Sequence, residues 1–538
     1  MSAEDLMRPK GSTPQDNQVD RRSFLYRASA LAAATAVGSV ALPAVAHAAP
    51  ASSSTPALVD VPARSTDLSE LTIAEAATLI RKGKLKPEDL VKAYLERIEA
   101  FDPTYQAFNL VLADQALARA RALGRARGSA LHGIPLAIKD NYYTRDVTTT
   151  ANSYLFADFV PPYDATAVRR LTTAGGIVLG KTQMGPLATT RATTPDGRIT
   201  TVNAWTPHNP STDPGGSSSG SATAVAARLA TSAVGTQTGG SITAPSNAQN
   251  LTGLKPTMGR VSLHGIIPLS YTRDHPGPLA RDAMDAAIML TAMAGEDPQD
   301  PRTQGLPPVP DLVTAATPVR QGRRVRARWR TRVGVIPGYT SGTSETAAAR
   351  KAALDVLAGI DGLSIVDVTM PDEWDLLTNS AFNNVRLPER SEPFLPMLRS
   401  DLRGFGVSVS GWLQGALLGA SEFLIGQRAK VVLLERVLTD LFEQCDVVVQ
   451  TSPTLLPELA LPIGFTSGGV PIGTILGGKP FGEDRLLAVA AAYQSVTDWH
   501  HRRPADPAEA LAAGRTTSRT TTVDRGRIRA EEVPDLMQ

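Results

Sequence analysis

Apolar residues recur every three to four positions in three stretches of the N-terminal third of the chain, residues 72–80, 91–98 and 112–123. This spacing places apolar side chains on one face of an α-helix, so each stretch predicts a helix. The first stretch opens with a Thr-x-x-Glu pattern from Thr72 to Glu75. Such a pattern is typical of a capping box, in which the two side chains satisfy free backbone N–H groups at the helix start.

Farther along, short runs of Val, Ile and Leu bounded by glycine replace the helical pattern, at residues 133–138 and 174–180. Runs of this length that alternate with helical segments predict the strands of an α/β sheet. A similar run at 333–337 predicts another strand. The stretch before it, 301–332, is rich in Pro and Arg, and we expect a long surface loop that connects two parts of one fold.

The first 48 residues have the pattern of an export signal. Arg21 and Arg22 precede a charge-free stretch, 28–46, that is rich in Ala, Val and Leu, and an Ala-His-Ala sequence ends at Ala48. A cationic start, an apolar middle and small residues at the end are typical of a secretory signal. The paired arginines resemble a bacterial twin-arginine signal, which predicts cleavage after Ala48 and a secreted or extracytoplasmic protein. The alternatives are a membrane anchor and a disordered tail.

Composition divides the rest of the chain into three parts. Residues 49–66 are rich in Pro, Ser and Ala and predict a flexible linker. Residues 67–505 contain the predicted helices and strands and are expected to form one domain. Residues 506–538 are rich in Thr, Arg and acidic residues without an apolar period, which predicts a flexible C-terminal tail.

Composition and charge exclude several classes of protein. With 42% hydrophobic and 20% charged residues, the 538-residue chain is not disordered as a whole. A net charge of +2 and 5% aromatic residues argue against binding of nucleic acid. The single cysteine, Cys445, excludes an internal disulfide and a Cys-rich zinc site, and His500 and His501 are adjacent rather than at helical spacing. We therefore expect no metal, no cofactor and no membrane span after signal removal.

Two segments rich in glycine and serine carry the candidate chemistry. The first, at 214–222, precedes an Ala-rich run at 222–233 that predicts a helix, so it is not a flexible linker. The second, at 235–242, contains Thr-Gly-Gly-Ser, and consecutive N–H groups across residues 238–241 are able to form a concave site for an oxyanion. Ser241, at the end of that site, is placed to attack the carbon whose oxygen the N–H groups hold.

A serine nucleophile needs a base, and Lys139 is the candidate. It follows the apolar run 134–138, where burial is expected to lower its pKa. Lowering a lysine pKa from about 10.4 to near neutrality costs about 4–5 kcal/mol, so such a lysine is expected to have a function. The alternative is a lysine whose ammonium forms a salt bridge with Asp140.

Together these segments resemble the amidase signature family, over about residues 68–502. The resemblance implies an α/β fold, in which a single large domain has a central mixed β-sheet covered by helices on both faces. Seven segments in order carry it: Gly-Ile-Pro-Leu-Ala-Ile-Lys-Asp-Asn at 133–141, the glycine–serine segment at 215–222, Thr-Gly-Gly-Ser-Ile at 238–242, Gly-Leu-Lys-Pro-Thr at 253–257, Asp-His-Pro-Gly-Pro-Leu-Ala-Arg at 274–281, Gly-Val-Pro-Ile-Gly at 469–473 and Phe-Gly-Glu-Asp at 481–484.

The resemblance implies a Ser–Ser–Lys triad. Ser241 is the expected acylated nucleophile, and Ser217, which follows a cis peptide bond in the family, is expected to relay protons between Ser241 and Lys139. Lys139 is the expected base and later the acid that protonates the departing amine. Ser218 is expected to support the triad by hydrogen bonding. The family's oxyanion hole maps to the backbone of Thr238, Gly239, Gly240 and Ser241.

Several positions depart from the family pattern. Ser219 replaces a common glycine, Gln237 stands where an acidic residue is frequent, and Thr243 stands where Arg is frequent. The last two changes are expected to be linked, because losing both charges avoids leaving one buried and unpaired. The segment 454–461 is also shorter than is usual in the family, and we expect this to alter the shape of the substrate pocket.

These observations favour a secreted hydrolase of carboxylic amides that acts on a small-molecule substrate. The stretch 266–271 resembles the branch that contains peptide amidases, which favours a C-terminal peptide amide or a related compound. The oligomeric state stays open, with a homodimer as one alternative.

Two other functions stay open. One is that of the glutamine-hydrolysing A subunit of an amidotransferase, and the other is that of a non-catalytic, secreted homologue that binds amides or peptides. The Gly-x-Ser-x-Gly sequence at 216–220 also fits the nucleophile elbow of α/β-hydrolases. That elbow requires a strand directly before it, whereas the residues at 206–214 predict a loop.

Overall fold

The computed structural model describes residues 59–124, 128–378, 380–449 and 456–508. The predicted export signal, 1–48, and all but the first three residues of the predicted tail lie outside these ranges. Asp506, where the predicted tail begins, pairs with Arg97 at 2.6 Å. None of the helices in the described ranges is long and apolar enough to cross a membrane.

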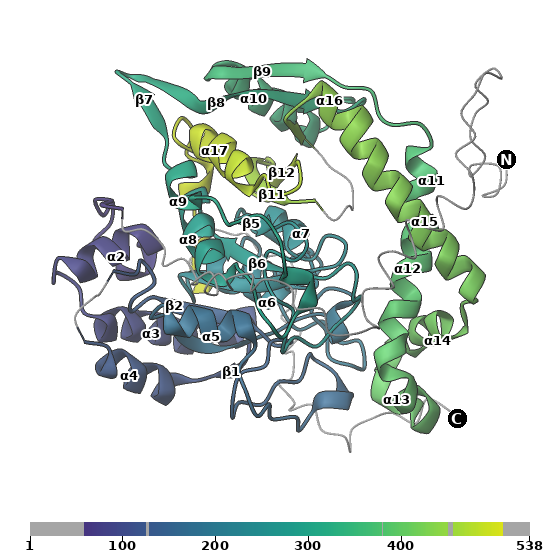
Figure 1. Ribbon diagram of the computed structural model, residues 1–538. Coiled ribbons are helices and arrows are strands. Elements are labelled where there is room, and N and C mark those ends of the chain that lie inside the picture. The colour runs from purple at the N-terminus through teal and green to yellow at the C-terminus, as the bar shows by residue number, and fades with distance from the viewer. Residues whose placement is uncertain (1–58, 125–127, 379, 450–455, 509–538) are drawn as a thin grey trace, which may run out of the picture. The chain divides into compact units, whose positions relative to one another are not determined.

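A mixed sheet organises the molecule, as the family resemblance implied, and it has 12 strands (Figure 1). Its order is β1-β3-β2-β4-β6-β5-β11-β12-β10-β8-β7, and β9 pairs with β8. The strands are β1 (Phe108–Val111), β2 (Pro135–Lys139), β3 (Ile177–Thr182), β4 (Ser232–Gln237), β5 (Thr252–Lys255), β6 (His275–Ala280), β7 (Val319–Gln321), β8 (Arg324–Val335), β9 (Asp361–Asp367), β10 (Val447–Val449), β11 (Glu458–Phe465) and β12 (Pro471–Gly478).

Helices cover both faces of the central strands. Every residue of β2 and of β4 is buried, which a sheet achieves only when both of its faces are covered. The helices are α2 (Ile73–Arg81), α3 (Pro87–Tyr105), α4 (Ala113–Ala122), α5 (Thr166–Thr173), α6 (Ser219–Ala226), α7 (Thr243–Ala248), α8 (Ala283–Met293), α9 (Leu312–Ala315), α10 (Glu345–Ala358), α11 (Trp374–Thr378), α12 (Ser380–Ser391), α13 (Leu395–Ser400), α14 (Val409–Leu417), α15 (Ala420–Arg436), α16 (Phe442–Gln444) and α17 (Glu483–Gln494).

The three N-terminal helices predicted from apolar spacing are confirmed as α2, α3 and α4. The capping box is also present at the start of α2. Thr72 Oγ1 accepts from the N–H of Glu75 at 3.2 Å, and Glu75 Oε2 accepts from the N–H of Thr72 at 3.0 Å.

Two expectations about secondary structure were wrong. The Ala-rich run 222–233 is not one helix, because α6 ends at Ala226 and β4 begins at Ser232. Arg228, with a φ of 59°, lies in the left-handed region that a continuing helix does not allow.

The Arg-rich part of 301–332 is a hairpin of β7 and β8 rather than a loop. Along β8, the exposed Arg324 and Arg326 alternate with the buried Val325 and Ala327. This period of two is typical of a strand, although the high content of Pro and Arg favoured an exposed loop.

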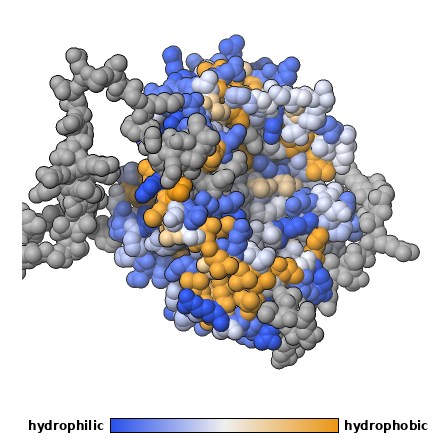
Figure 2. Space-filling view, turned by 90° about the vertical axis from the view of Figure 1, so that its right-hand side faces the viewer, coloured by the Kyte–Doolittle hydropathy of each residue, from blue (hydrophilic) through white to orange (hydrophobic). Residues whose placement is uncertain are grey.

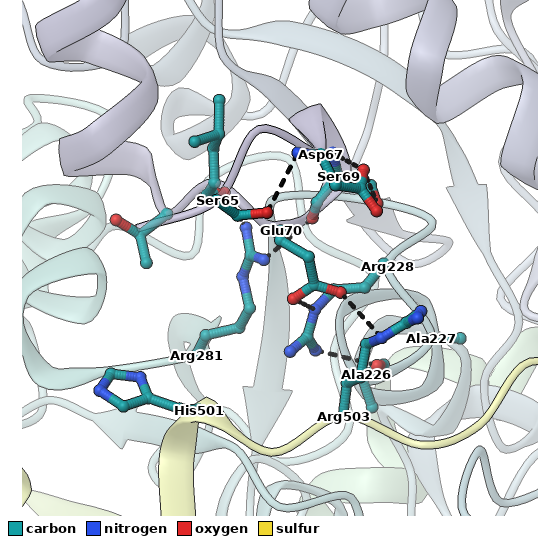
Figure 3. A network of polar contacts seen from close by, with 12 residues as sticks. Ser65, Asp67, Ser69, Glu70, Ala226, Ala227, Arg228, Arg281, His501 and Arg503 are labelled. Atoms are coloured by element: carbon teal, nitrogen blue, oxygen red, sulfur yellow. Dashed lines mark hydrogen bonds and ion pairs between the residues drawn. The ribbon is translucent and has the colours of Figure 1, made fainter. Parts of the chain in front are cut away.

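Buried arginines hold the N-terminal part of the described chain on the core (Figure 3). Arg281 donates to the carbonyl oxygen of Ser69 at 3.0 Å. Arg228 pairs with Glu70 at 3.1 Å, and Arg503, near the C-terminal end of the described residues, pairs with the same carboxylate at 3.3 Å. This network therefore joins segments from the two ends of the domain.

Residues 59–66, the described part of the expected linker, contact α2. The N–H of Val61 donates to Thr78 Oγ1 at 3.0 Å, and Arg64 pairs with Glu75 at 2.9 Å. This part of the segment is therefore held on the domain.

Near the helices α13 and α14, an apolar cluster contains the aromatic side chains of Phe394, Phe405 and Trp412. The side of the molecule that carries these helices also exposes apolar side chains (Figure 2), among them Leu417 and Leu424.

Candidate active site

The candidate site lies where adjacent parallel strands end. Strand β2 runs parallel to both of its neighbours, β3 and β4. The carboxyl ends of parallel strands meet at one edge of a sheet, where open α/β sheets bind their ligands. Lys139 is the last residue of β2 and Gln237 is the last residue of β4, so both predicted segments reach this edge.

The amine of Lys139 lies among hydroxyl groups. Lys139 Nζ is 2.8 Å from Ser217 Oγ and donates to Ser218 Oγ at 2.9 Å. It also donates to Thr236 Oγ1 at 2.8 Å. The structure thus brings together three residues that the sequence singled out, and it adds Thr236, which the sequence analysis missed.

Burial controls the protonation of Lys139. The side chain has no exposed surface, and desolvation lowers its pKa from 10.5 to about 7. The negative charge of Asp274 acts in the opposite direction and raises this pKa. The hydroxyl groups that contact the amine carry no charge, so none of them supplies the negative charge that would hold Lys139 protonated.

Asp140 is not the partner of Lys139. Its Oδ1 lies 3.4 Å from the Nζ of Lys181, a residue of the adjacent strand β3. Thr150 and Asn109 donate to Asp140 Oδ2, at 2.6 Å and 2.8 Å. The alternative expectation of a Lys139–Asp140 salt bridge is therefore wrong.

Ser217 follows a cis peptide bond from Gly216. A Cβ atom on Gly216 would lie 2.6 Å from the carbonyl oxygen of Thr190, so the backbone passes too closely for any other residue. Ser219, which replaces a common glycine, braces the same loop, because its hydroxyl donates to the carbonyl oxygen of Gly215 at 2.6 Å and accepts from the N–H of Ala192 at 2.9 Å.

Ser241 lies on the loop between β4 and α7 and is half-buried. Among the described residues, the N–H groups of Gly239, Gly240 and Ser241 donate no hydrogen bond to the protein. Three consecutive N–H groups without internal partners, next to a serine hydroxyl, are suited to binding an oxyanion.

Thr238, at the start of this loop, is tied to Asp274 by a short hydrogen bond from its hydroxyl. Asp274 also accepts from the N–H groups of Leu269, at 2.7 Å, and Ser270, at 3.0 Å. Burial raises the pKa of Asp274. Asp274 carried no signal of its own in the sequence, although it opens one of the seven segments on which the family resemblance rests.

The two departures at positions 237 and 243 lie in contact. Thr243 Oγ1 donates to Gln237 Oε1 at 3.2 Å. Both side chains are buried, so a single charge at either position would have needed a partner. Their contact supports the expectation that the two changes are linked.

Within the part of the chain that the structure describes, no group of three or more His, Cys, Asp or Glu side chains is arranged to hold a metal ion. The rings of His500 and His501 contact each other at 3.7 Å between centroids. The Nδ1 atom of His501 lies 3.0 Å from a guanidinium nitrogen of Arg64.

Comparison with known proteins places the chain in a family. The sequence model of the Amidase family matches residues 89–454. The chain is 35% identical over 499 residues to the A subunit of glutamyl-tRNA(Gln) amidotransferase from Chloroflexus aurantiacus, a match that covers 82% of this chain and 99% of the relative. It is 36% identical over 498 residues to the protein of the same name from Roseiflexus castenholzii, covering 82% and 98%.

Solved structures agree with the sequence relatives. The native peptide amidase of Stenotrophomonas maltophilia superposes with a TM-score of 0.66 at 30% identity, over 81% of this chain and 98% of that chain. A complex of the peptide amidase PAM with the inhibitor chymostatin gives a TM-score of 0.69 at 30% identity, over 81% and 99%. The chain therefore belongs to the amidase family, whose fold it shares, and it is an amide C–N bond hydrolase.

Proposed function

We propose that this protein hydrolyses carboxylic amides through an acyl-enzyme on Ser241, with Ser217 and Lys139 carrying the proton. The contact between Lys139 Nζ and Ser217 Oγ, at 2.8 Å inside a fully buried site, is the observation on which the proposal rests. A lysine with a pKa of about 7 is neutral in a large fraction of molecules at neutral pH, so its lone pair can accept a proton.

Acylation begins with two proton transfers that both run from Ser241 toward Lys139. Ser241 Oγ attacks the carbonyl carbon while its proton passes to Ser217 Oγ, and the proton of Ser217 passes to Lys139 Nζ. The negative charge that develops on the carbonyl oxygen is held by the N–H groups of residues 239–241. The C–N bond breaks as the proton returns through Ser217 to the departing nitrogen, which leaves as ammonia or an amine.

Deacylation uses the same groups with water in place of the serine. Water attacks the ester carbon, one of its protons passes through Ser217 to Lys139, and the proton then returns to Ser241 Oγ as the ester bond breaks. The products are a carboxylic acid and the free enzyme. Lys139 therefore acts once as base and once as acid in each half of the cycle.

We propose a peptide C-terminal amide or a related small, uncharged amide as the substrate. The similarity to solved peptide amidases at 30% identity supports this choice. The segment that resembles that branch in sequence is fixed beside the site, because the N–H of Ile267 donates to the carbonyl oxygen of Asn141 at 2.9 Å. Tyr271, at its end, is 55% exposed, and the guanidinium of Arg302 lies 4.0 Å from the centre of its ring.

A second candidate function is glutamine hydrolysis within an amidotransferase complex. The 35% identity to amidotransferase A subunits, over 99% of their length, favours it. Ammonia release distinguishes the two functions. The first predicts release from peptide amides by the isolated chain, and the second predicts release from glutamine that depends on partner proteins.

A fluorophosphonate probe tests the proposed nucleophile. The intact protein should gain the mass of one phosphonyl group, and peptide mapping should place it on Ser241. Ser241→Ala should abolish labelling, whereas Ser211→Ala, at an exposed serine, should label like the wild type. Absence of labelling on the wild type, together with no amide hydrolysis, would favour the non-catalytic binding homologue.

We also propose export of the protein through the twin-arginine-like signal at 1–48. The paired arginines, the apolar run and the Ala-His-Ala end support it. A reporter fused to residues 1–50 should leave the cytoplasm of a bacterium, and Arg21→Lys with Arg22→Lys should retain it. Continued export of the double-lysine variant through the twin-arginine route would contradict the proposal.

A further inference from the structure

The side chain of Gln237 spans the loop that carries Ser241. Its Oε1 accepts from the N–H groups of Ile242 and Thr243, both at 2.9 Å, and its Nε2 donates to the carbonyl oxygen of Gly239 at 2.9 Å. One buried amide group therefore joins the start of the loop to its end.

The orientation of this amide decides whether the loop holds together. In the reversed orientation, the NH₂ group of Gln237 would face two N–H donors, and its oxygen would face the carbonyl oxygen of Gly239. All three hydrogen bonds would then be lost in a buried site, where unsatisfied polar groups are costly.

Glu458 of β11 selects the orientation. Gln237 Nε2 also donates to Glu458 Oε2 at 2.9 Å. A carboxylate accepts hydrogen bonds and donates none, so only the NH₂ side of the amide can face it.

Lys255 maintains the negative charge of that carboxylate. Its Nζ lies 3.2 Å from Glu458 Oε1, and the two residues stand opposite each other in the pairing of β5 with β11. Both side chains are buried, so the charges compensate each other away from water.

We propose that Glu458 is a positioning residue of the active site. By fixing the amide of Gln237, it holds the loop 238–242 in the conformation that presents Ser241 beside the N–H groups of residues 239–241. This inference rests on the proposed function, because it assigns a role to the loop only if Ser241 is the nucleophile. Gln237 is neutral and stands where the family pattern has an acidic residue. The carboxylate of Glu458 on β11, 2.9 Å from Gln237 Nε2, supplies a negative charge next to that position.

Exchange of the two side chains tests the proposal. Gln237→Glu places two carboxylates 2.9 Å apart and should lower kinact/KI for a fluorophosphonate by about 100-fold, the effect expected of a misplaced nucleophile. Glu458→Gln replaces a group that only accepts by an amide that can also donate, so position 458 no longer selects the orientation of Gln237, and kinact/KI should fall by about tenfold. The loss should lie in kinact, with KI unchanged, because the loop acts on the reacting serine.

The double variant Gln237→Glu/Glu458→Gln reverses the donor and the acceptor. It should react at least about tenfold faster than Gln237→Glu alone, because the amide at position 458 then donates to the carboxylate at position 237. The labelling rate of the double variant should still lie below that of the wild type, because the carbonyl oxygen of Gly239 loses the hydrogen bond from Gln237 Nε2. A rate equal to the product of the two single losses would overturn the positioning role.

Glu75→Gln is the matched control, because Glu75 is a buried carboxylate that pairs with Arg64 and accepts from the N–H of Thr72, the residue before α2. It should leave kinact unchanged. If Glu458→Gln does not fold, Gln237→Leu is measured in its place, because it removes the amide that joins the two ends of the loop. A kinact equal to that of the wild type would likewise overturn the proposal. If the fluorophosphonate does not label the wild-type protein, the proposed function is overturned as well. If it labels the wild type but the losses in the two single variants simply multiply in the double variant, only the role of Glu458 is overturned.

Discussion

Asp140 directly follows Lys139 in sequence, yet it pairs with Lys181 of the adjacent strand, whose Nζ lies 3.4 Å from Asp140 Oδ1. Lys181 stands opposite Ile138 in the pairing of β3 with β2, so its side chain lies on the face of the sheet opposite to that of Lys139, and Asp140, in the turn after β2, pairs with it there. Lys139 therefore contacts hydroxyl groups, and its pKa falls to about 7. The carboxylate next to Lys139 thus leaves the proposed base free to lose its proton.

The pH dependence of acylation should follow Lys139. The base acts only when neutral, so the rate of fluorophosphonate labelling should rise as pH passes about 7 and level off above it. Lys139→Ala should remove this step and abolish labelling near pH 7. Stopped-flow or quenched labelling from pH 5 to 9 measures the profile, and an unchanged profile in Lys139→Ala would show that another base operates.

Asp274→Asn should move the same profile to lower pH. The negative charge of Asp274 raises the pKa of Lys139, so its neutralisation should lower that pKa and shift the midpoint in the acidic direction. The asparagine retains an oxygen for the N–H groups of Leu269 and Ser270. If the midpoint of the pH profile does not move, Asp274 either is neutral in the native protein or does not affect the pKa of Lys139.

Gly216→Ala should displace Ser217. Its Cβ would lie 2.6 Å from the carbonyl oxygen of Thr190, and backbone atoms do not yield as flexible side chains do. We expect labelling to fall by about 100-fold, because misplacing a catalytic group by about 1 Å has that effect. Gly124→Ala, where no atom lies within 4 Å of the added Cβ, is the control and should label normally.

Thiol reagents should leave the native protein unmodified and active. Cys445 is the single cysteine, it is fully buried, and burial raises its pKa from 9.0 to about 11. Iodoacetamide at pH 8 should therefore add no mass to the folded protein and one carbamidomethyl group after denaturation. Inactivation of the folded protein by the reagent would place a reactive thiol in the mechanism and contradict the serine pathway.

Arg228→Met should destabilise the protein without altering the chemistry. Arg228 is buried and pairs with Glu70 in the network that holds the N-terminal segment, so its loss should lower the free energy of unfolding by about 3 kcal/mol (Figure 3). Urea denaturation measures this change, and kinact of the folded fraction should not move. Arg403→Met, which breaks an exposed pair with Asp401, should leave unfolding nearly unchanged.

Much of the site could be predicted from local sequence. The apolar run that ends at Lys139 predicts a buried strand end, and the glycines around Ser217 and Ser241 predict sharp turns with exposed N–H groups. These inferences succeed because strand ends, turns and capping boxes depend on neighbouring residues. The hairpin of β7 and β8 was missed, although its alternation of Arg with small apolar residues is also a local signal.

Contacts that span the sheet could not be predicted. Thr236 touches Lys139 because β4 pairs with β2 in a register that sets Ile138 opposite Val234, and no local pattern fixes that register. Glu458 reaches Gln237 from β11, more than two hundred residues away in sequence. Neither residue carried a signal by itself, since buried polar side chains acquire a role only from their partners.

The sequence by itself determined the family, the α/β class and the identity of the lysine and serines that meet, because these depend on short motifs whose backbone geometry is locally encoded. The tertiary structure decided which charges pair. It turned Asp140 toward Lys181, buried Lys139 among hydroxyls and placed Glu458 on the amide of Gln237. Electrostatic free energies depend on burial and on distances of a few ångströms, and both are fixed only when distant strands come together.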